Sequence, residues 1–142
     1  MKIDERLKSA LEESELPHEL MDTGDYLCEV QIEEGGTVAV FASSATEKFR
    51  EYEIRGISIV VGILDGPLSI MAAHMLLENN AHMKMCSWSL QVGDGTMALV
   101  LTGRLPATAS GTTLKLFIEG MAQIAREQQV WLESQSNSDN EE

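Results

Sequence analysis

Apolar residues recur along this chain with two different periods, one typical of helices and one typical of strands. The helical period comes first. Near the N-terminus the apolar residues recur at i, i+4, i+7 and i+8, with charged residues between them: Ile3, Leu7, Ala10 and Leu11. This spacing places them on one face of a helix. It predicts an amphipathic helix over residues 2–14 that is ended by Pro17, and then a loop over residues 15–25 with one helical turn.

Two later regions alternate with a period of two, which is typical of strands with one buried face. Residues 28–32 and 38–42 form the first predicted hairpin. Residues 86–92 and 97–101 form the second, because Gly93-Asp94-Gly95 between them supplies the positive-φ turn that a tight hairpin needs.

The segment between these hairpins is harder to interpret. Residues 43–55 are polar, and Ser44 with Glu47 has the spacing of a capping box, which predicts a short surface helix. Residues 57–64 are uncharged and β-branched, which favours a strand covered on both faces.

Two further helices complete the predicted order. Asp65-Gly66-Pro67 caps and starts a central helix that runs to about Glu78. A long C-terminal helix begins at Ser110 and ends near Ser134. The fold class is therefore α+β, in the order α-β-β-β-α-β-β-α, with helices packed against an antiparallel sheet. We expect one domain over residues 1–134 and a disordered acidic tail over residues 135–142.

Composition narrows the function classes. The 142 residues carry 10 Lys and Arg against 23 Asp and Glu, a net charge of −13, which repels nucleic acid and anionic lipid. We therefore expect neither a nucleic-acid nor a membrane partner. The charged N-terminal stretch lacks the apolar region of a secretory signal, and Cys28 and Cys86 are too few for a disulfide scaffold. Both observations favour a cytoplasmic protein.

One triplet resembles a catalytic motif. Asp22-Thr23-Gly24 could present a carboxylate that shares a proton with a symmetry mate, as in a small dimeric aspartic protease. Such a site needs an apolar strand before the aspartate, whereas here residues 17–21 contain Pro, His and Glu. An acidic loop is therefore the favoured interpretation, and the protease is the remote alternative.

Other catalytic and metal signals are weak. The nearest metal-ligand pair is His82 with Cys86, and the sequence contains no CxxC, HExxH, GxSxG or phosphate-binding glycine motif. We therefore predict no catalytic residues, no metal and no cofactor.

The central helix is apolar on nearly every side. Only Ser69, His74 and Glu78 interrupt the apolar residues between 68 and 78. An amphipathic helix on a small domain needs one apolar stripe, so the second face must be covered by more sheet or by another subunit. We favour a homodimer over a helix that is enclosed in its own core.

With this order of elements, the chain resembles the class I type III secretion chaperone-like superfamily of bacteria. The resemblance lies in a charged first helix ending at Leu16-Pro17, the strand Tyr26–Ile32, Asn79-Asn80 closing the central helix, the Val92–Thr96 hairpin, Leu105-Pro106, and a last helix ending near Trp131-Leu132. It covers most of residues 2–134.

The resemblance implies a homodimer without enzymatic activity that keeps a segment of a secreted effector extended on apolar patches. It also implies site residues. The dimer residues are Met71, Met75 and Trp88, and the partner-binding residues are Leu7, Leu11, Val38 and Val40. The same superfamily includes stress-related proteins of the YbjN type, which would act as regulators through protein–protein contacts. The sequence does not separate these two roles.

Overall fold

The computed structural model describes residues 2–32 and 36–139 of the chain. Within them the elements are α1 (Glu5–Ser14), β1 (His18–Leu20), β2 (Tyr26–Ile32), β3 (Gly36–Phe49), β4 (Tyr52–Leu64), α2 (Ile70–His82), β5 (Cys86–Gly93), β6 (Thr96–Pro106) and α3 (Gly111–Asp139). The α+β class is confirmed, with one strand more than predicted.

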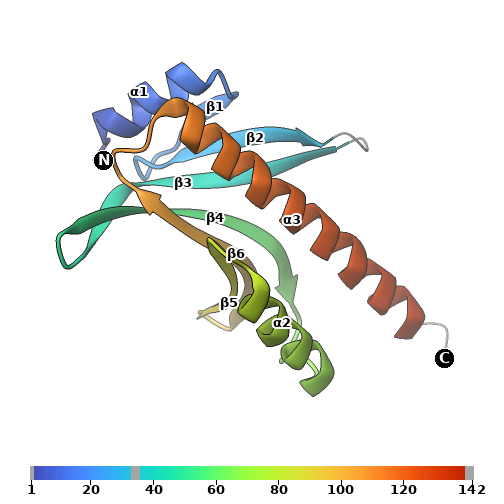
Figure 1. Cartoon of the computed structure of the whole chain (residues 1–142). Helices are drawn as coiled ribbons and strands as arrows, with labels where there is room; N and C mark the ends of the chain where they lie inside the picture. The colour runs from blue at the N-terminus through green and yellow to red at the C-terminus, as the bar shows by residue number, and fades with distance from the viewer. Residues whose placement is uncertain (1, 33–35, 140–142) are drawn as a thin grey trace.

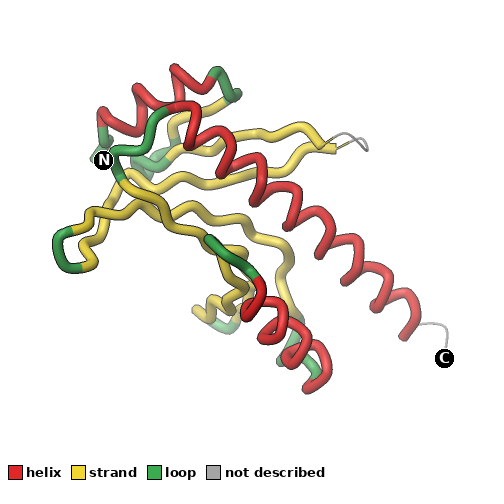
Figure 2. The backbone as a smooth tube through the Cα atoms, in the orientation of Figure 1, coloured by secondary structure: helices red, strands yellow, loops and turns green. Residues whose placement is uncertain are grey.

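All six strands join one antiparallel sheet in the order β1-β2-β3-β4-β6-β5. Strand β6 lies beside β4 because the β5–β6 hairpin folds back after α2. Helices α1 and α3 cross the same side of the sheet, whereas α2 lies at its other end (Figure 1). Figure 2 shows the long β3–β4 hairpin reaching beyond the helices.

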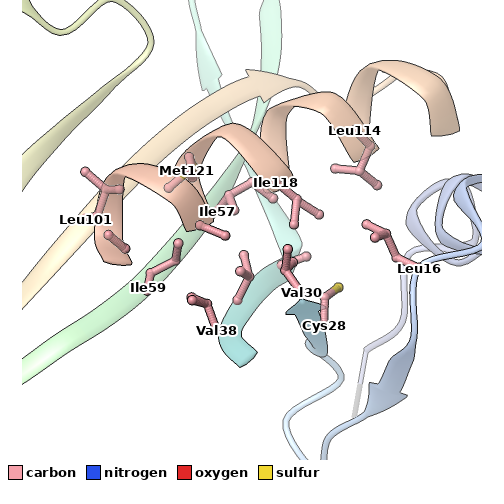
Figure 3. Packing of buried hydrophobic residues seen from close by; sticks show 14 of the residues in the cluster. Leu16, Cys28, Val30, Val38, Ile57, Ile59, Leu101, Leu114, Ile118 and Met121 are labelled. Atoms are coloured by element: carbon pink, nitrogen blue, oxygen red, sulfur yellow. The ribbon is translucent and has the colours of Figure 1, made fainter. Parts of the chain in front are cut away.

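The core lies between that side of the sheet and helices α1 and α3. Alternate strand positions contribute Cys28 and Val30, and α3 contributes one helical stripe: Leu114, Ile118, Met121, Ala122 and Ala125 (Figure 3). Helix α1 approaches α3 so closely that a Cβ on Gly111 would come within 2.6 Å of the Ala10 carbonyl oxygen. The strand and helix periodicities of the sequence are thus both satisfied by one layer of helices on one layer of sheet.

Two of the sequence expectations for residues 15–55 are wrong. The loop contains a short strand, β1, instead of a helical turn, and residues 43–55 extend the β3–β4 hairpin instead of forming a helix. Ser44 does not cap a helix because it lies in a register shift of β3. There its hydroxyl donates to the Gly24 carbonyl and its N–H donates to the Asp25 carboxylate.

Several helix boundaries also differ from expectation, and α1 begins at Glu5 instead of residue 2. Helix α2 begins at Ile70 because the Ser69 hydroxyl accepts a hydrogen bond from the Ala72 N–H at 3.1 Å, and it continues to His82. Helix α3 continues to Asp139, five residues beyond the predicted end, so residues 135–139 are helical. The last part of the predicted tail, residues 140–142, lies outside the described residues.

The strand over residues 57–64 is covered on one face only. Ile57, Ile59 and Val61 are buried under the helices, whereas Val60 and Ile63 on the outer face are 47% and 64% exposed. The prediction of cover on both faces is therefore wrong for the single chain, since no helix of the described residues covers the outer face of β4 (Figure 1).

Candidate functional site

Helix α2 is attached to the rest of the chain through few groups. Leu76 is its only buried residue. Asn80 holds the free edge of β5: its amide donates to the Trp88 carbonyl at 3.1 Å, and its oxygen accepts from the Trp88 N–H at 2.7 Å. This pair of bonds closes a main-chain position that an edge strand would otherwise leave open. Asn80 therefore fixes α2 against β5.

The rest of α2 presents apolar side chains to solvent. Ile70, Met71 and Leu77 are 80%, 75% and 68% exposed, and Met75 is also exposed, at 38%. Single exposed apolar residues are common, but a contiguous set on one helix marks an interaction surface.

A groove continues this apolar surface between α2, β5 and α3. It consists of two adjoining cavities of about 390 and 470 Å³, which share His82, Met83 and Ile124. Four methionines line it: Met75 of α2, Met83 and Met85 of the connection between α2 and β5, and Met121 of α3. Flexible thioethers can repack around different apolar partners. We call the exposed residues of α2 together with this groove the methionine surface.

The three dimer residues predicted from the sequence differ in their exposure at this surface. Met71 and Met75 are exposed on it, whereas Trp88 is buried, lines the groove and bonds to Asn80 through its main chain. Trp88 therefore contributes to the floor of the groove and supports α2 from within the chain.

The four predicted partner-binding residues lie elsewhere. Leu7, Leu11, Val38 and Val40 are all buried in the core between α1, the sheet and α3. Their apolar periodicity reports packing within the chain, so this assignment is corrected: they are core residues and form no accessible patch.

An ionic cluster that the sequence did not predict surrounds the buried Arg55 at the N-terminus of α1. Arg55, only 2% exposed, donates to the Asp4 carboxylate at 2.8 Å and to the Ser43 carbonyl at 2.7 Å. Arg6 binds Asp4 and makes two further bonds, both of 2.8 Å, to Glu53. The signal was present in the alternation of β4, where Arg55 occupies the same face as Ile57 and Ile59.

The pKa values of its two carboxylates indicate that this cluster has a structural role. The hydrogen bonds from Arg6, and then those from Arg55, hold the pKa of Asp4 well below its usual range. Arg6 and Thr46 lower the pKa of Glu53 to about 2. Both carboxylates are therefore ionised and paired at neutral pH, so they are poorly suited to act as bases. The cluster ties α1 to β4.

The Asp-Thr-Gly triplet forms a turn between β1 and β2. Gly24 has φ +94°, and a Cβ there would collide with the backbone of Lys2. Its carbonyl accepts from Ser44, and the neighbouring Asp25 accepts from the Ser44 N–H. Asp22 is exposed on this turn. Close packing against Lys2 and a positive φ thus account for the glycine at this position. The geometry of this chain gives the protease alternative no support.

Metal-ligand types do not gather in the part of the chain that the structure describes. No three His, Cys, Asp or Glu residues there lie together as a metal site would require. His82 and Cys86 both line the methionine groove, but no third ligand joins them. Burial raises the pKa of the Cys28 thiol to about 11 and also raises that of Cys86, so neither is a reactive thiolate.

Comparison with known proteins adds no family. The sequence matches no protein-family model. A search of curated proteins also gives no match. Across residues 2–32 and 36–139, none of the helices combines the length and apolar character needed to span a membrane.

Proposed function

We propose that this chain is a non-enzymatic, type III secretion chaperone-like protein that acts as a homodimer and keeps a segment of an effector protein extended and secretion-competent. The observation that carries the proposal is the methionine surface. Helix α2 is apolar on nearly every side, yet Leu76 alone is buried. A second copy packed on α2 would remove this apolar area from water, which is the main favourable contribution to protein association.

The charge of the chain supports the same site. At −13 each, two copies repel one another through most of their surfaces. The exposed side chains Ile70, Met71 and Leu77 carry no charge, so a contact centred on them brings few carboxylates together, although Glu78 of α2 and Glu127 of the groove lie on the same surface. In this proposal the protein works in the cytoplasm, where both cysteines stay reduced.

The first test is the oligomeric state. Met71→Glu places a carboxylate on an exposed position of the single chain, but buries it unpaired in the dimer, at a cost of several kcal/mol. Light scattering should give twice 15.6 kDa for the parent and 15.6 kDa for the variant. Phe49→Glu, equally exposed at the tip of the β3–β4 hairpin, should remain dimeric. A parent that is monomeric at micromolar concentration ends the proposal of a dimer.

The second test is the partner. Affinity capture from the native cell should recover the N-terminal region of one protein reproducibly, and the corresponding synthetic segment should bind the purified chain as an extended peptide. Recovery of cleaved peptides with turnover, abolished by Asp22→Asn, would instead indicate the aspartic protease.

A YbjN-type regulator remains the second candidate. It would use the same methionine surface for its protein–protein contacts, so the oligomeric state does not separate the two roles. A captured partner that is folded, and whose exported amount is unchanged in cells lacking this chain, would favour the regulator.

A further inference from the structure

The central sheet divides between β3 and β4. Their pairing runs from Phe49 opposite Tyr52 to Phe41 opposite Ser58, and no pair is formed beyond that point within the described residues. Both strands nevertheless continue. Residues 36–40 of β3 pair only with β2, and residues 59–64 of β4 pair only with β6. Figure 1 shows the two strands diverging toward their far ends.

This division leaves main-chain groups without a strand partner on two facing edges. In an antiparallel strand, alternate residues direct their N–H and C=O groups to opposite sides. Every second residue of the β3 stretch therefore points its polar main-chain groups into the gap. On β4 this alternation is interrupted by the register shift between Val60 and Gly62, where Val61 is left out of the pairing with β6. Such groups require hydrogen bonds, which water or another strand can supply.

A cavity of about 260 Å³ occupies the gap. Its walls are Thr37, Val38, Ala39 and Phe41 on β3 and Ile59, Val60 and Val61 on β4, and its floor is formed by Ala125 and Gln129 of α3. Charged side chains are absent from this lining. The methionine groove lies on the other flank of α3, along Ile124, Glu127 and Gln128. The two sites are therefore separate. We call the cavity with its two strand edges the strand slot.

We propose that the strand slot binds an extended segment of a partner polypeptide as an added strand, with apolar side chains at alternate positions and basic residues at its ends. Main-chain hydrogen bonds to the free edges supply recognition that is independent of sequence, as in other strand additions. Alternate apolar side chains cover Val60 and Phe41. The basic ends follow from the net charge of −13, which attracts cations to the surface around an uncharged slot.

This inference rests on the proposed function in one respect, that the partner is a polypeptide held extended. It does not require the dimer. It also gives the partner segment a location that the buried residues Leu7, Leu11 and Val40 cannot supply, whereas Val38 lines the slot.

The test uses the full chain and a synthetic probe peptide. The probe has a core of alternating Val and Thr as long as residues 59–64, flanked by lysines and labelled for fluorescence anisotropy. One control peptide carries a proline at the centre of the core, which removes a main-chain donor. Another replaces the flanking lysines by glutamates. The lysine-flanked probe should bind, the proline peptide should not, and the glutamate peptide should bind more weakly, with a difference that shrinks at high salt.

Val60→Glu tests the slot itself. The added carboxylate favours approach of a lysine-flanked probe, but must be buried beneath the bound strand, so binding should weaken by about tenfold or more. Ala39→Glu on the opposite wall should act in the same way, and Val92→Glu on β5 should change binding little. Thermal melts of all three variants show which are folded. Because Val60 and Ala39 lie on opposite walls, a variant that fails to fold leaves the other to test the slot.

Hydrogen exchange locates the bound probe. Amides within residues 36–40 and 59–64 should gain protection. Protection confined to α2 and the methionine groove, or binding that is unchanged in folded Val60→Glu and Ala39→Glu, would overturn the strand slot while leaving the proposed protein-binding function standing. No binding by the parent to any of these probes also rejects the slot as a general strand site.

Discussion

Helices α1 and α2 are similar in length, but the more polar of the two buries more of its residues. Helix α1 is rich in charge, yet it buries Leu7, Ala10, Leu11 and Ser14. Helix α2 is largely apolar, yet it buries only Leu76. The cause is where each helix lies relative to the sheet. Helix α1 lies over the sheet against α3, whereas α2 follows the end of β4 and, among the elements that the structure describes, packs mainly against the edge strand β5.

The comparison shows that the apolar residues of the two helices carry different information. In α1 they stabilise the fold of one chain. In α2 most of them contribute nothing to that fold, because they remain in water in the single chain. An apolar helix that its own chain does not cover is what the proposed dimer requires.

The largest expected difference between the helices comes from matched leucine substitutions. Leu11→Ala in α1 removes a fully buried side chain and leaves a cavity, so it should cost about 2–5 kcal/mol of unfolding free energy. Leu77→Ala in α2, at a position 68% exposed, should cost less than about 0.5 kcal/mol in the single chain.

Urea unfolding measures both variants, and it should be done in the Met71→Glu background so that association does not contribute. Equal losses for the two leucines would mean that α2 is packed within its own chain, and the contrast drawn above would be wrong.

The second prediction concerns the ionic anchor of α1, which α2 lacks. Asp4→Asn keeps the helix cap but removes the charge that faces buried Arg55, at a cost of about 1–3 kcal/mol at neutral pH. The pKa values of Asp4 and Glu53 are lowered in the folded chain, so their contribution is present above the ordinary carboxyl pKa and is lost as pH falls toward about 2.

Thermal melts between pH 7 and pH 2.5 measure this effect. The parent should lose stability steeply below about pH 4.5, and Asp4→Asn should lose less over the same interval. Parallel curves for the two proteins would show that Asp4 does not contribute to the acid sensitivity.

The β3–β4 region shows why part of the fold could be predicted from sequence and part could not. The β5–β6 turn was predicted because Asp94-Gly95 is a turn signature, and both residues have positive φ. The β3–β4 turn was missed because Arg50-Glu51 has no such signature, although Arg50 also adopts positive φ. Long-range groups hold that hairpin in place, including the bond of Arg55 to Ser43.

The candidate site was predicted only in part for a related reason. Periodicity identifies apolar faces but does not say what covers them. The family resemblance therefore led to Leu11 and Met71 both being assigned as contact residues, although one lies in the core and the other in solvent. The strand slot left no signal in the sequence, because it depends on where the pairing of two long strands stops.

The third prediction is a local effect confined to α2. Ser69→Ala removes the N-cap bond to Ala72 and should cost about 1 kcal/mol of local helix stability. Because α2 has few buried contacts, it should open without global unfolding. Native-state hydrogen exchange of α2 amides should therefore accelerate about fivefold, with the exchange of α1 amides unchanged. Equal acceleration in both helices would mean that they unfold together.

The smallest expected effect is at the end of α3, where a deletion extends the comparison to a third helix. Residues 135–142 include no apolar residue, so their removal takes away nothing that could be buried against the sheet. The melting temperature should stay within about 1–2 °C of the parent value, as for other surface changes. An equally long N-terminal deletion, residues 2–9, removes Asp4 and buried Leu7 and should prevent folding. A drop of several degrees on removing residues 135–142, measured by circular dichroism, would mean that polar contacts alone hold this end of α3 in place.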